Sequence, residues 1–314
     1  KSSALSRHIE WLDGLGYRTA IVPEAATELI TNGIRPEKFS DPIVFQRTLL
    51  RNILCKEELF SQAVLEMREF ETGRPAVLLC DRGCKDGEGY VGREDYAKIL
   101  ADENLDQVSA CDKRYAAVIH LRTAADGKEE FYTLANNTAR RESPAEARIL
   151  DRLTEAAWHG HPRLIIIDNA SPDFEGKILK VRQAVSSILG IPSPVEHERK
   201  FLLQTHALRI DIPIPSVTVE IEQHYLDKEG ERIRKRSRDG AFMYFHTWKE
   251  NCPQASRMRV DKIIGEQEYL RLLERKRTDT GTIRKSRTYF VWNNQYFELD
   301  HFYHNGMWLL EVRP

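Results

Sequence analysis

Apolar residues in the first part of the chain alternate between helical and buried-strand spacing. Residues 2–14 place Leu5, Ile9 and Leu12 on one helical face. Continuous apolar runs of strand length stand at 19–22, 76–80, 116–121 and 164–167, and helical patterns stand at 43–70, 143–158 and 174–189. Continuous apolar strands that alternate with helices indicate a parallel sheet covered on both faces. The first half of the chain is therefore predicted to be α/β.

The pattern changes to period two after the proline-rich stretch at 192–194. Alternating segments stand at 195–203, 216–226, 232–238, 241–249, 288–292 and 296–302, and only 265–277 has helical spacing. Short alternating strands separated by turns predict an antiparallel sheet or barrel. We therefore expect two domains, 1–192 and 193–314, with the fold class α/β plus α+β.

Length and charge exclude several classes of protein. The 314 residues exceed the usual size of one domain, and the net charge of −1 provides no whole-chain attraction to nucleic acid. The five cysteines have no paired metal spacing, which favours free thiols in a reducing, cytoplasmic compartment. No apolar run approaches about 18 residues, so no segment is expected to span a bilayer. Because the first residue is lysine, we interpret the sequence as a fragment whose beginning lies upstream.

The first predicted helix opens with Lys1-Ser2-Ser3, the end of a P-loop pattern whose glycines would lie upstream. In a P-loop the lysine reaches the β/γ-phosphates and the hydroxyl binds Mg²⁺. Asp81 ends a buried strand, where a Walker-B-type carboxylate would hold the metal. The alternative for Asp81 is a helix-capping or loop aspartate.

A pair of arginines, Arg140 and Arg141, lies in a polar segment between two predicted strands. Such a pair can belong to a lid that closes cations onto phosphates. The alternative is a solvated helix entry capped by Ser143.

Residues 1–189 resemble the NadR/TRPL-translocation-defect family of AAA-type P-loop domains. The matching stretches are 21–26 (IVPEAA), 79–83 (LCDRG), 131–142 and 166–169 (IIDN). The resemblance implies nucleotide binding, with GTP and ATP both open. It implies that Ser2 binds Mg²⁺ and Asp81 assists the metal. It also implies that Glu24 lies at the acceptor or catalytic edge and that Asp168 and Asn169 lie near the nucleotide base. The implied nucleotide-binding residues are Lys1, Ser2, Ser3, Glu24, Arg82, Arg140, Arg141, Asp168 and Asn169.

In the second half, residues 195–201 alternate charges along a predicted strand. Glu196, Glu198 and Lys200 share one face. Like charges two residues apart on one face are costly unless something neutralises them, and a divalent metal beside a polyanion would do so. The alternative is a solvated outer face.

Further charged strand faces follow. Arg232, Arg234 and Arg236 share the face of one strand, and Glu298 and Asp300 share another. Similar patterns involve Thr247, Lys249, Arg284–Arg287 and Glu311. If these faces turn outward, they are ordinary solvated surfaces; if they turn inward, they line a barrel that can hold a polyphosphate.

The ExExK pattern of Glu196, Glu198 and Lys200, with the later charges in order, resembles the CYTH superfamily of triphosphate tunnel metalloenzymes. The resemblance implies an antiparallel tunnel whose triphosphate-binding residues are Lys200, Arg232, Arg234, Arg236, Lys249 and Arg287. It implies that Mg²⁺ or Mn²⁺ is bound by Glu196, Glu198, Glu298, Asp300 and Glu311. Chemistry, where present, would fall to Glu198 and Lys200, with Asp81 in the first domain.

Two departures from the CYTH pattern favour binding over hydrolysis. Glu311 is followed by Arg313 where a second glutamate is usual, and a strand that often carries glutamate reads RVDK at 259–262. The order of the two modules resembles the TRPL-translocation-defect family. That resemblance implies a regulatory or trafficking protein that binds GTP or ATP and a polyphosphate or phosphoinositide head group, with peripheral membrane contact. The alternatives are a metal-dependent triphosphatase and a small-molecule kinase.

Overall fold

The computed structural model describes the backbone of residues 2–70, 75–131, 142–171, 173–191, 199–205, 207, 209–252 and 255–313. Side chains are described for the same residues except 2–4, 68–70, 131, 249–260 and 313. The chain forms two compact units, each made of several segments. The first comprises Lys1–Leu105, Arg122–Ala157 and Asn169–Arg182; the second comprises Asp106–Leu121, Trp158–Asp168 and Gln183–Pro314.

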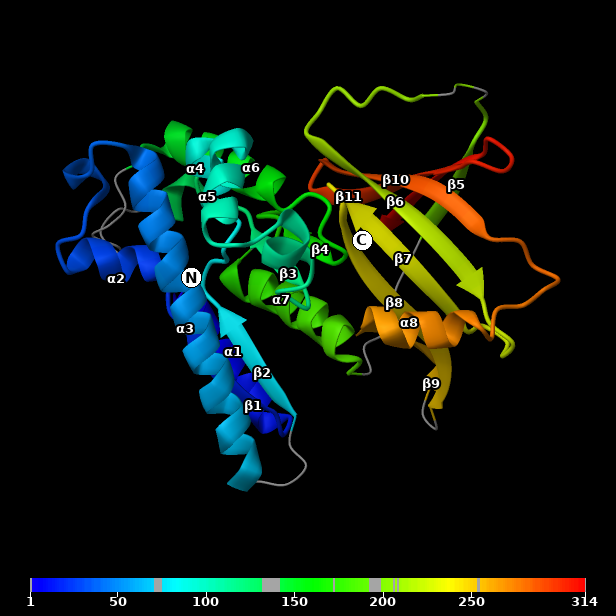
Figure 1. Ribbon diagram of the computed structural model, residues 1–314. Coiled ribbons are helices and arrows are strands. Elements are labelled where there is room, and N and C mark those ends of the chain that lie inside the picture. The colour runs from blue at the N-terminus through cyan, green and yellow to red at the C-terminus, as the bar shows by residue number, and fades with distance from the viewer. Residues whose placement is uncertain are drawn as a thin grey trace. The chain divides into compact units, whose positions relative to one another are not determined.

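The first unit is mainly helical and holds one pair of parallel strands. Its elements include α1 (Ser2–Gly14), β1 (Arg18–Val22), α2 (Ala25–Thr31), α3 (Pro42–Phe70), β2 (Ala76–Cys80), α4 (Glu88–Val91), α5 (Arg93–Asp102) and α6 (Pro144–Ala157), followed by the start of α7 (Phe174–Leu189). β1 and β2 pair in parallel from Arg18↔Ala76 to Val22↔Cys80. The long helix α3 packs against both strands (Figure 1). Leu12, Val22 and Leu50 are buried in this unit.

The second unit contains an eight-stranded antiparallel sheet and a two-stranded parallel sheet. Its strands are β3 (Val118–Leu121), β4 (Leu164–Ile167), β5 (Arg199–Leu203), β6 (Ser216–Tyr225), β7 (Arg232–Arg238), β8 (Ala241–Cys252), β9 (Ala255–Ile264), β10 (Ile283–Trp292), β11 (Gln295–Phe302) and β12 (Trp308–Arg313). The large sheet has the order β5-β12-β11-β10-β6-β7-β8-β9, and β3 pairs in parallel with β4. In the described residues β5 and β9 are its two edges.

Two hydrophobic clusters cover opposite faces of the large sheet. On one face, Trp158 and Leu164 pack with Val217, Val219 and Tyr289. On the other face, helix α8 (Glu266–Leu273) is held by Tyr269, whose ring centroid lies 4.9 Å from that of Tyr244. Helix α8 packs against strands β7 and β8 (Figure 1). The apolar alternates of the strands therefore build a core on each side of the sheet.

The secondary structure agrees closely with the periodicity of the sequence. The helices predicted at 2–14, 43–70 and 174–189 are present, as are the period-two strands of the second half. Parallel pairing is confirmed, but as two separate pairs, β1-β2 and β3-β4, instead of one sheet. Helix α2 was not predicted as an element, and of strand β9 only residues 259–262 were expected to be a strand. None of the described helices combines the length and apolar composition needed to cross a bilayer.

Candidate functional site

The carboxyl ends of β1 and β2 carry the acidic and basic residues that the sequence suggests for a nucleotide site. Parallel strands end at the same edge, and the amide of Asp81 donates to the carbonyl of Val22 at 2.9 Å. The Arg82 guanidinium lies 3.5 Å from Glu24 Oε1 and 3.5 Å from Asp86 Oδ2. Burial lowers the pKa of Arg82, but the nearby carboxylates of Asp86, Glu24 and Asp81 raise it by more. The net pKa is therefore above its ordinary value, and the guanidinium stays charged.

The backbone of Arg82 is strained in a way that fixes where its side chain points. Its φ is 82°, a left-handed conformation that is uncommon for a residue with a side chain. Thr27 donates to Glu24 Oε2 at 2.7 Å and so holds the carboxylate that Arg82 contacts. Strained residues of this kind gather at functional sites. The arrangement holds a partly exposed guanidinium at the strand edge, a group suited to phosphate.

A buried lysine supports the loop that follows Arg82. Lys85 is fully buried, contacts Glu88 and lies 5.6 Å from the ring centroid of Tyr96. The Tyr96 hydroxyl donates to the carbonyl of Cys84, which fixes the loop further. No periodicity in the sequence singles out Lys85, so sequence reasoning missed it.

The side-chain amide of Asn169 is engaged with the loop after β3. It donates to the carbonyls of Thr123 at 2.7 Å and Asp126 at 2.8 Å, and its oxygen accepts from Lys177 Nζ at 2.5 Å. These contacts hold the loop in place. The suggested base contact of Asp168, which directly follows β4, and Asn169 stays a prediction.

The remaining nucleotide candidates lie outside the described side chains. These are Lys1, Ser2, Ser3, Arg140 and Arg141. Their suggested phosphate, metal and lid roles stay predictions.

In the second unit, the register of the large sheet brings most of the triphosphate candidates to one face. Directly opposed residues of an antiparallel pair share a face, and Lys200 opposes Glu311, which opposes Glu298. Continuing across the sheet by the same rule gives what we call the charged face. Its described charged residues are Lys200, Arg232, Arg234, Arg236, Arg238, Lys285 and Arg287, with Asp261, Glu298, Asp300 and Glu311. The described residues of the charged face thus comprise seven cations and four carboxylates.

One part of the charged face, across β10, β11 and β12, is a buried ion cluster around Arg287. Its Nε donates to Asp300 Oδ1 at 2.6 Å and its Nη2 to Asp300 Oδ2 at 2.7 Å. The same guanidinium contacts Glu298 and lies 3.7 Å from Glu311 Oε2. Lys285 Nζ donates to Asp300 at 2.6 Å. We call these five residues the Arg287 cluster.

Burial and charge act against each other on the ionisable groups of the Arg287 cluster. Burial raises the pKa of Asp300, but Arg287 and Lys285 lower it more, so the net direction is down. Burial, with the charge of Arg287, lowers the pKa of Lys285 to about 8. Asp300 therefore stays ionised, because the two cations of the Arg287 cluster neutralise its charge.

The described carboxylates alone do not fit a metal centre. Glu298, Asp300 and Glu311 offer the oxygen ligands that Mg²⁺ and Mn²⁺ prefer, but they converge on the guanidinium of Arg287. Among the described residues no group of three acidic, histidine or cysteine side chains is arranged to hold a metal ion. Glu196 and Glu198 lie outside the described residues. No chemical step is assigned to a metal here.

The other part of the charged face follows β7. Arg234 contacts Asp261 at 3.0 Å, and its guanidinium lies 5.1 Å from the ring centroid of Phe245. Thr247 bonds the same carboxylate. Arg232 opposes Thr247 in the register and is half-buried. The backbone of Lys249 is in register with that of residue 259, and its side chain is outside the described part.

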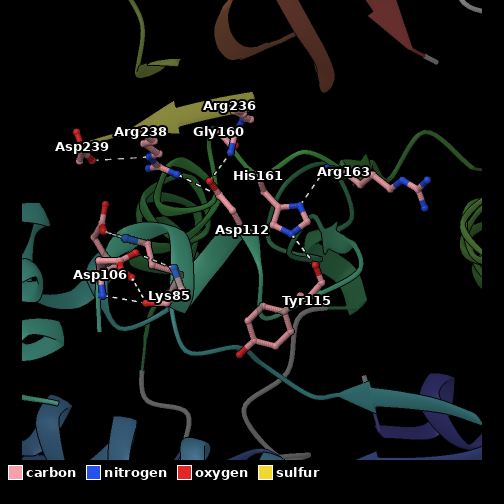
Figure 2. A network of polar contacts seen from close by, with 12 residues as sticks. Lys85, Asp106, Asp112, Tyr115, Gly160, His161, Arg163, Arg236, Arg238 and Asp239 are labelled. Atoms are coloured by element: carbon pink, nitrogen blue, oxygen red, sulfur yellow. Dashed lines mark hydrogen bonds and ion pairs between the residues drawn. The ribbon is translucent and has the colours of Figure 1, made fainter. Parts of the chain in front are cut away.

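Deeper along β7, two buried arginines meet a carboxylate from a distant segment. Arg236 contacts Asp112 and the carbonyl of Gly160, and Arg238 Nη1 lies 3.4 Å from Asp112 Oδ1. Figure 2 shows the three charged side chains converging. Arg236, Arg238 and Asp112 are 3%, 4% and 1% exposed. Tyr289 lies beneath Arg236, with its ring centroid 5.5 Å from the guanidinium carbon.

The segment that follows α6 is fixed beside these arginines. The amide of Gly160 donates to the Tyr296 hydroxyl at 3.0 Å, and that hydroxyl donates to the carbonyl of His161 at 3.2 Å. His161 Nε2 lies 3.0 Å from the carbonyl of Tyr115, and its Nδ1 accepts from the amide of Arg163 at 3.0 Å (Figure 2). The ring is therefore a neutral Nε2–H tautomer. Burial lowers the pKa of His161 to about 4.

The middle of the charged face is closed by hydrophobic core. Val217, Val219 and Ile221 stand between the two charged parts and pack against Trp158 and Leu164. Among the described residues, hydrophobic side chains thus separate the two charged parts of this face. Anions can approach at the half-buried Arg232 and Arg234 and at the half-exposed Lys200.

Sequence reasoning did not name Arg238 or Asp112 as site residues, and it included Lys285 only within the run 284–287. Arg238 extends the period of 232, 234 and 236, so the period-two rule could have found it. Asp112 has no such signal, because its partners are 124 and 126 residues away.

The comparisons with known proteins identify the first half. A family model described as an AAA domain matches residues 2–177. No curated protein matches the chain.

Several solved structures are similar to part of the chain. An inorganic triphosphatase shares 25% identity, with 39% of this chain and 75% of that chain covered and a TM-score of 0.27. A conserved hypothetical protein from Pyrococcus furiosus shares 19% identity, covering 38% and 78%, with a TM-score of 0.27. A protein from Pyrococcus horikoshii shares 18% identity, covering 38% and 77%, also at 0.27. At these TM-scores the likeness does not establish a shared fold.

Proposed function

Because the chain belongs to the AAA domain family over residues 2–177, we propose that it binds phosphate groups in two places. A nucleotide binds beside Arg82 at the edge of β1 and β2. A polyphosphate, or the phosphates of a phosphoinositide head group, binds on the charged face along β7. The observation that carries the second part is the register of β7, which lines up four arginines on one face.

The charge balance of β7 supports anion binding. Arg232, Arg234, Arg236 and Arg238 alternate along the strand, and the carboxylates that contact them include Asp261, Asp112 and the exposed Asp239. Guanidinium groups two residues apart repel one another unless anions lie between them. Successive phosphates of a polyphosphate supply such charges, and each forms charge-assisted hydrogen bonds with an arginine. Phe245 beneath Arg234 limits the motion of that guanidinium, which lowers the entropy lost on binding.

The AAA family membership supports nucleotide binding in the first unit. We propose Mg²⁺-complexed GTP or ATP as its ligand, with Arg82 beside the phosphates. The regulatory or trafficking role, the GTP preference and peripheral membrane contact through a phosphoinositide belong to the same proposal.

Isothermal titration tests the two binding regions separately. We expect wild-type protein to bind tripolyphosphate or an inositol polyphosphate head group, and Arg234→Gln to weaken that binding roughly 10- to 100-fold, because one charge-assisted contact is lost. Arg284→Gln is the matched control, since Arg284 is exposed and pairs with Glu222 on the opposite face of the same sheet.

Nucleotide titration completes the test. GTP and ATP should bind with Mg²⁺ present, and Arg82→Gln should weaken them while leaving tripolyphosphate binding unchanged. Absence of any binding by nucleotides, tripolyphosphate and head groups would end the proposal.

The second candidate is a metal-dependent triphosphatase. It is favoured by the half-exposed cation Lys200, whose Nζ lies 3.9 Å from Glu311 Oε2 at the margin of the charged face. Because Glu298, Asp300 and Glu311 are bound to Arg287, a metal ion there would need ligands beyond these three. Phosphate release from tripolyphosphate or nucleoside triphosphates, measured with Mg²⁺, Mn²⁺ or EDTA, distinguishes hydrolysis from binding. An enzyme should lose most of its rate in EDTA and in Lys200→Ala. Equal background rates in all samples would exclude catalysis.

A further inference from the structure

We infer that Asp112 is an internal competitor for the anion on β7, so that its carboxylate sets the affinity of the charged face. This inference rests on the proposed binding of polyphosphate by that face. It concerns a residue that lies outside the sheet and that no sequence pattern connects with it.

Asp112 stands where an anion would stand on β7. Its two carboxylate oxygens contact different arginines, Oδ2 the Nη1 of Arg236 and Oδ1 the Nη1 of Arg238 at 3.4 Å. The two arginines are separated by one residue and share a face with Arg234. A phosphate chain that is bound at Arg232 and Arg234 and extends along the strand therefore reaches the next two arginines, which Asp112 contacts.

The segment carrying Asp112 is short, and its first residue is held by a contact that does not involve the arginines. It runs from Val108 to Asp112 as one irregular helical turn, and Val108 packs with Met243 and Phe245 of β8. Displacing Asp112 requires this turn to shift, and Cys111, which is fully buried, moves with it. A tripolyphosphate carries several negative charges and can outweigh one carboxylate, whereas chloride cannot.

A purely structural role for Asp112 predicts the opposite response to substitution. If the carboxylate only builds the anion site, Asp112→Asn loosens Arg236 and Arg238 and weakens tripolyphosphate binding. If it competes, the same substitution removes the negative charge that the ligand has to replace, and binding tightens. Asparagine keeps the volume and an acceptor oxygen, so the change is mainly one of charge.

The first test is isothermal titration of the full chain with tripolyphosphate. We expect Asp112→Asn to bind about tenfold more tightly than wild type, because removing a unit charge near the ligand changes affinity on this scale. The control, Asp227→Asn, removes an exposed carboxylate paired with Arg275 away from the charged face and should leave affinity unchanged. In the Arg234→Gln background the gain from Asp112→Asn should shrink, which assigns the effect to the charged face and not to the nucleotide region.

The second test uses the unmodified protein and does not depend on the variant folding. Tripolyphosphate should accelerate alkylation of Cys111, followed by peptide mass spectrometry, relative to sodium chloride at equal ionic strength. Cys55, which is exposed on α3, reports the intrinsic rate of the reagent.

The outcomes separate the inference from the proposed function. Tripolyphosphate binding by wild type with no tightening in a folded Asp112→Asn protein, or with no change at Cys111, overturns the inference and leaves the proposed function standing. No tripolyphosphate binding by either protein overturns the proposed function itself.

Discussion

The two charged parts of the charged face neutralise their arginines in different ways. Arg287 on β10 is bound by Glu298 and Asp300 of the adjacent strand, only 11 and 13 residues further along the chain. Arg236 on β7 is bound by Asp112, 124 residues away and outside the sheet. The Arg287 cluster is thus completed by strand pairing itself. The Asp112 contact exists only while a separate segment is docked, so the β7 arginines are the ones whose partner can be exchanged for a ligand.

The largest expected effect is the loss of Arg287. In Arg287→Gln, three carboxylates that are 1–5% exposed lose their common cation. Removing one partner of a buried ion network leaves uncompensated charge, which costs about 3–5 kcal/mol of unfolding free energy. Urea unfolding followed by circular dichroism measures the change.

The control for Arg287 lies three residues before it on the same strand. Arg284 pairs with Glu222 at 3.1 Å on the opposite face, and its side chain is 69% exposed. Arg284→Gln should cost less than about 1 kcal/mol. Similar losses for both variants would contradict the description of Arg287 as the centre of a buried network.

Mild acid should destabilise the segment around His161 and leave Asp300 of the Arg287 cluster ionised. His161 has a pKa of about 4 when folded against 6.5 when free, so the unfolded chain binds more protons between these values. The stability due to neutral His161 is complete above about pH 6.5 and falls by about 3 kcal/mol as the pH drops to about 4. The pKa of Asp300 is lowered below 3.8, so its contribution is lost only at lower pH.

The acid effect is measured as the pH dependence of unfolding free energy in wild type minus that in His161→Gln. The glutamine variant lacks the titrating ring, so its curve should be flatter between pH 6.5 and 4. Parallel curves for the two proteins would show that His161 is not the group responsible.

The smallest expected effect concerns how closely the chain at Gly160 packs against β6 and β7. Its φ is +90°, and a Cβ there would lie 2.8 Å from Val217 Cγ1 and 3.0 Å from Arg238 Nη1. Gly240 has a similar φ of +83° with nothing within 4 Å. Both glycine-to-alanine changes incur backbone strain, but only Gly160→Ala adds crowding, worth about 1–2 kcal/mol more. Thermal unfolding compares the two, and equal losses would mean that the segment has room to move.

The sequence predicted what depends on neighbouring residues. Period-two alternation placed Arg232, Arg234 and Arg236 on one face, because that geometry belongs to any strand. It also located the strands that carry Glu298 and Asp300. The suggested roles of these side chains stay predictions, since sharing a face does not show what they bind.

The sequence could not predict what depends on distant segments. Residues 106–121 and 158–168 belong to the unit of the antiparallel sheet, although their apolar strands have the pattern of the α/β half. The sequence around Trp158 does not indicate whether its ring packs on a parallel or an antiparallel sheet, because burial against either sheet stabilises an apolar ring. The closing of the middle of the charged face was invisible for the same reason.

The pairing of β5 with β12 has a consequence for how the protein is made. The first strand of the large sheet in the chain, Arg199–Leu203, finds its partner only at Trp308–Arg313. During synthesis β5 therefore emerges without its partner, and the six strands β6 to β11 are made before β12. Its exposed Phe201 and Leu202 are then available for wrong association until β12 is made.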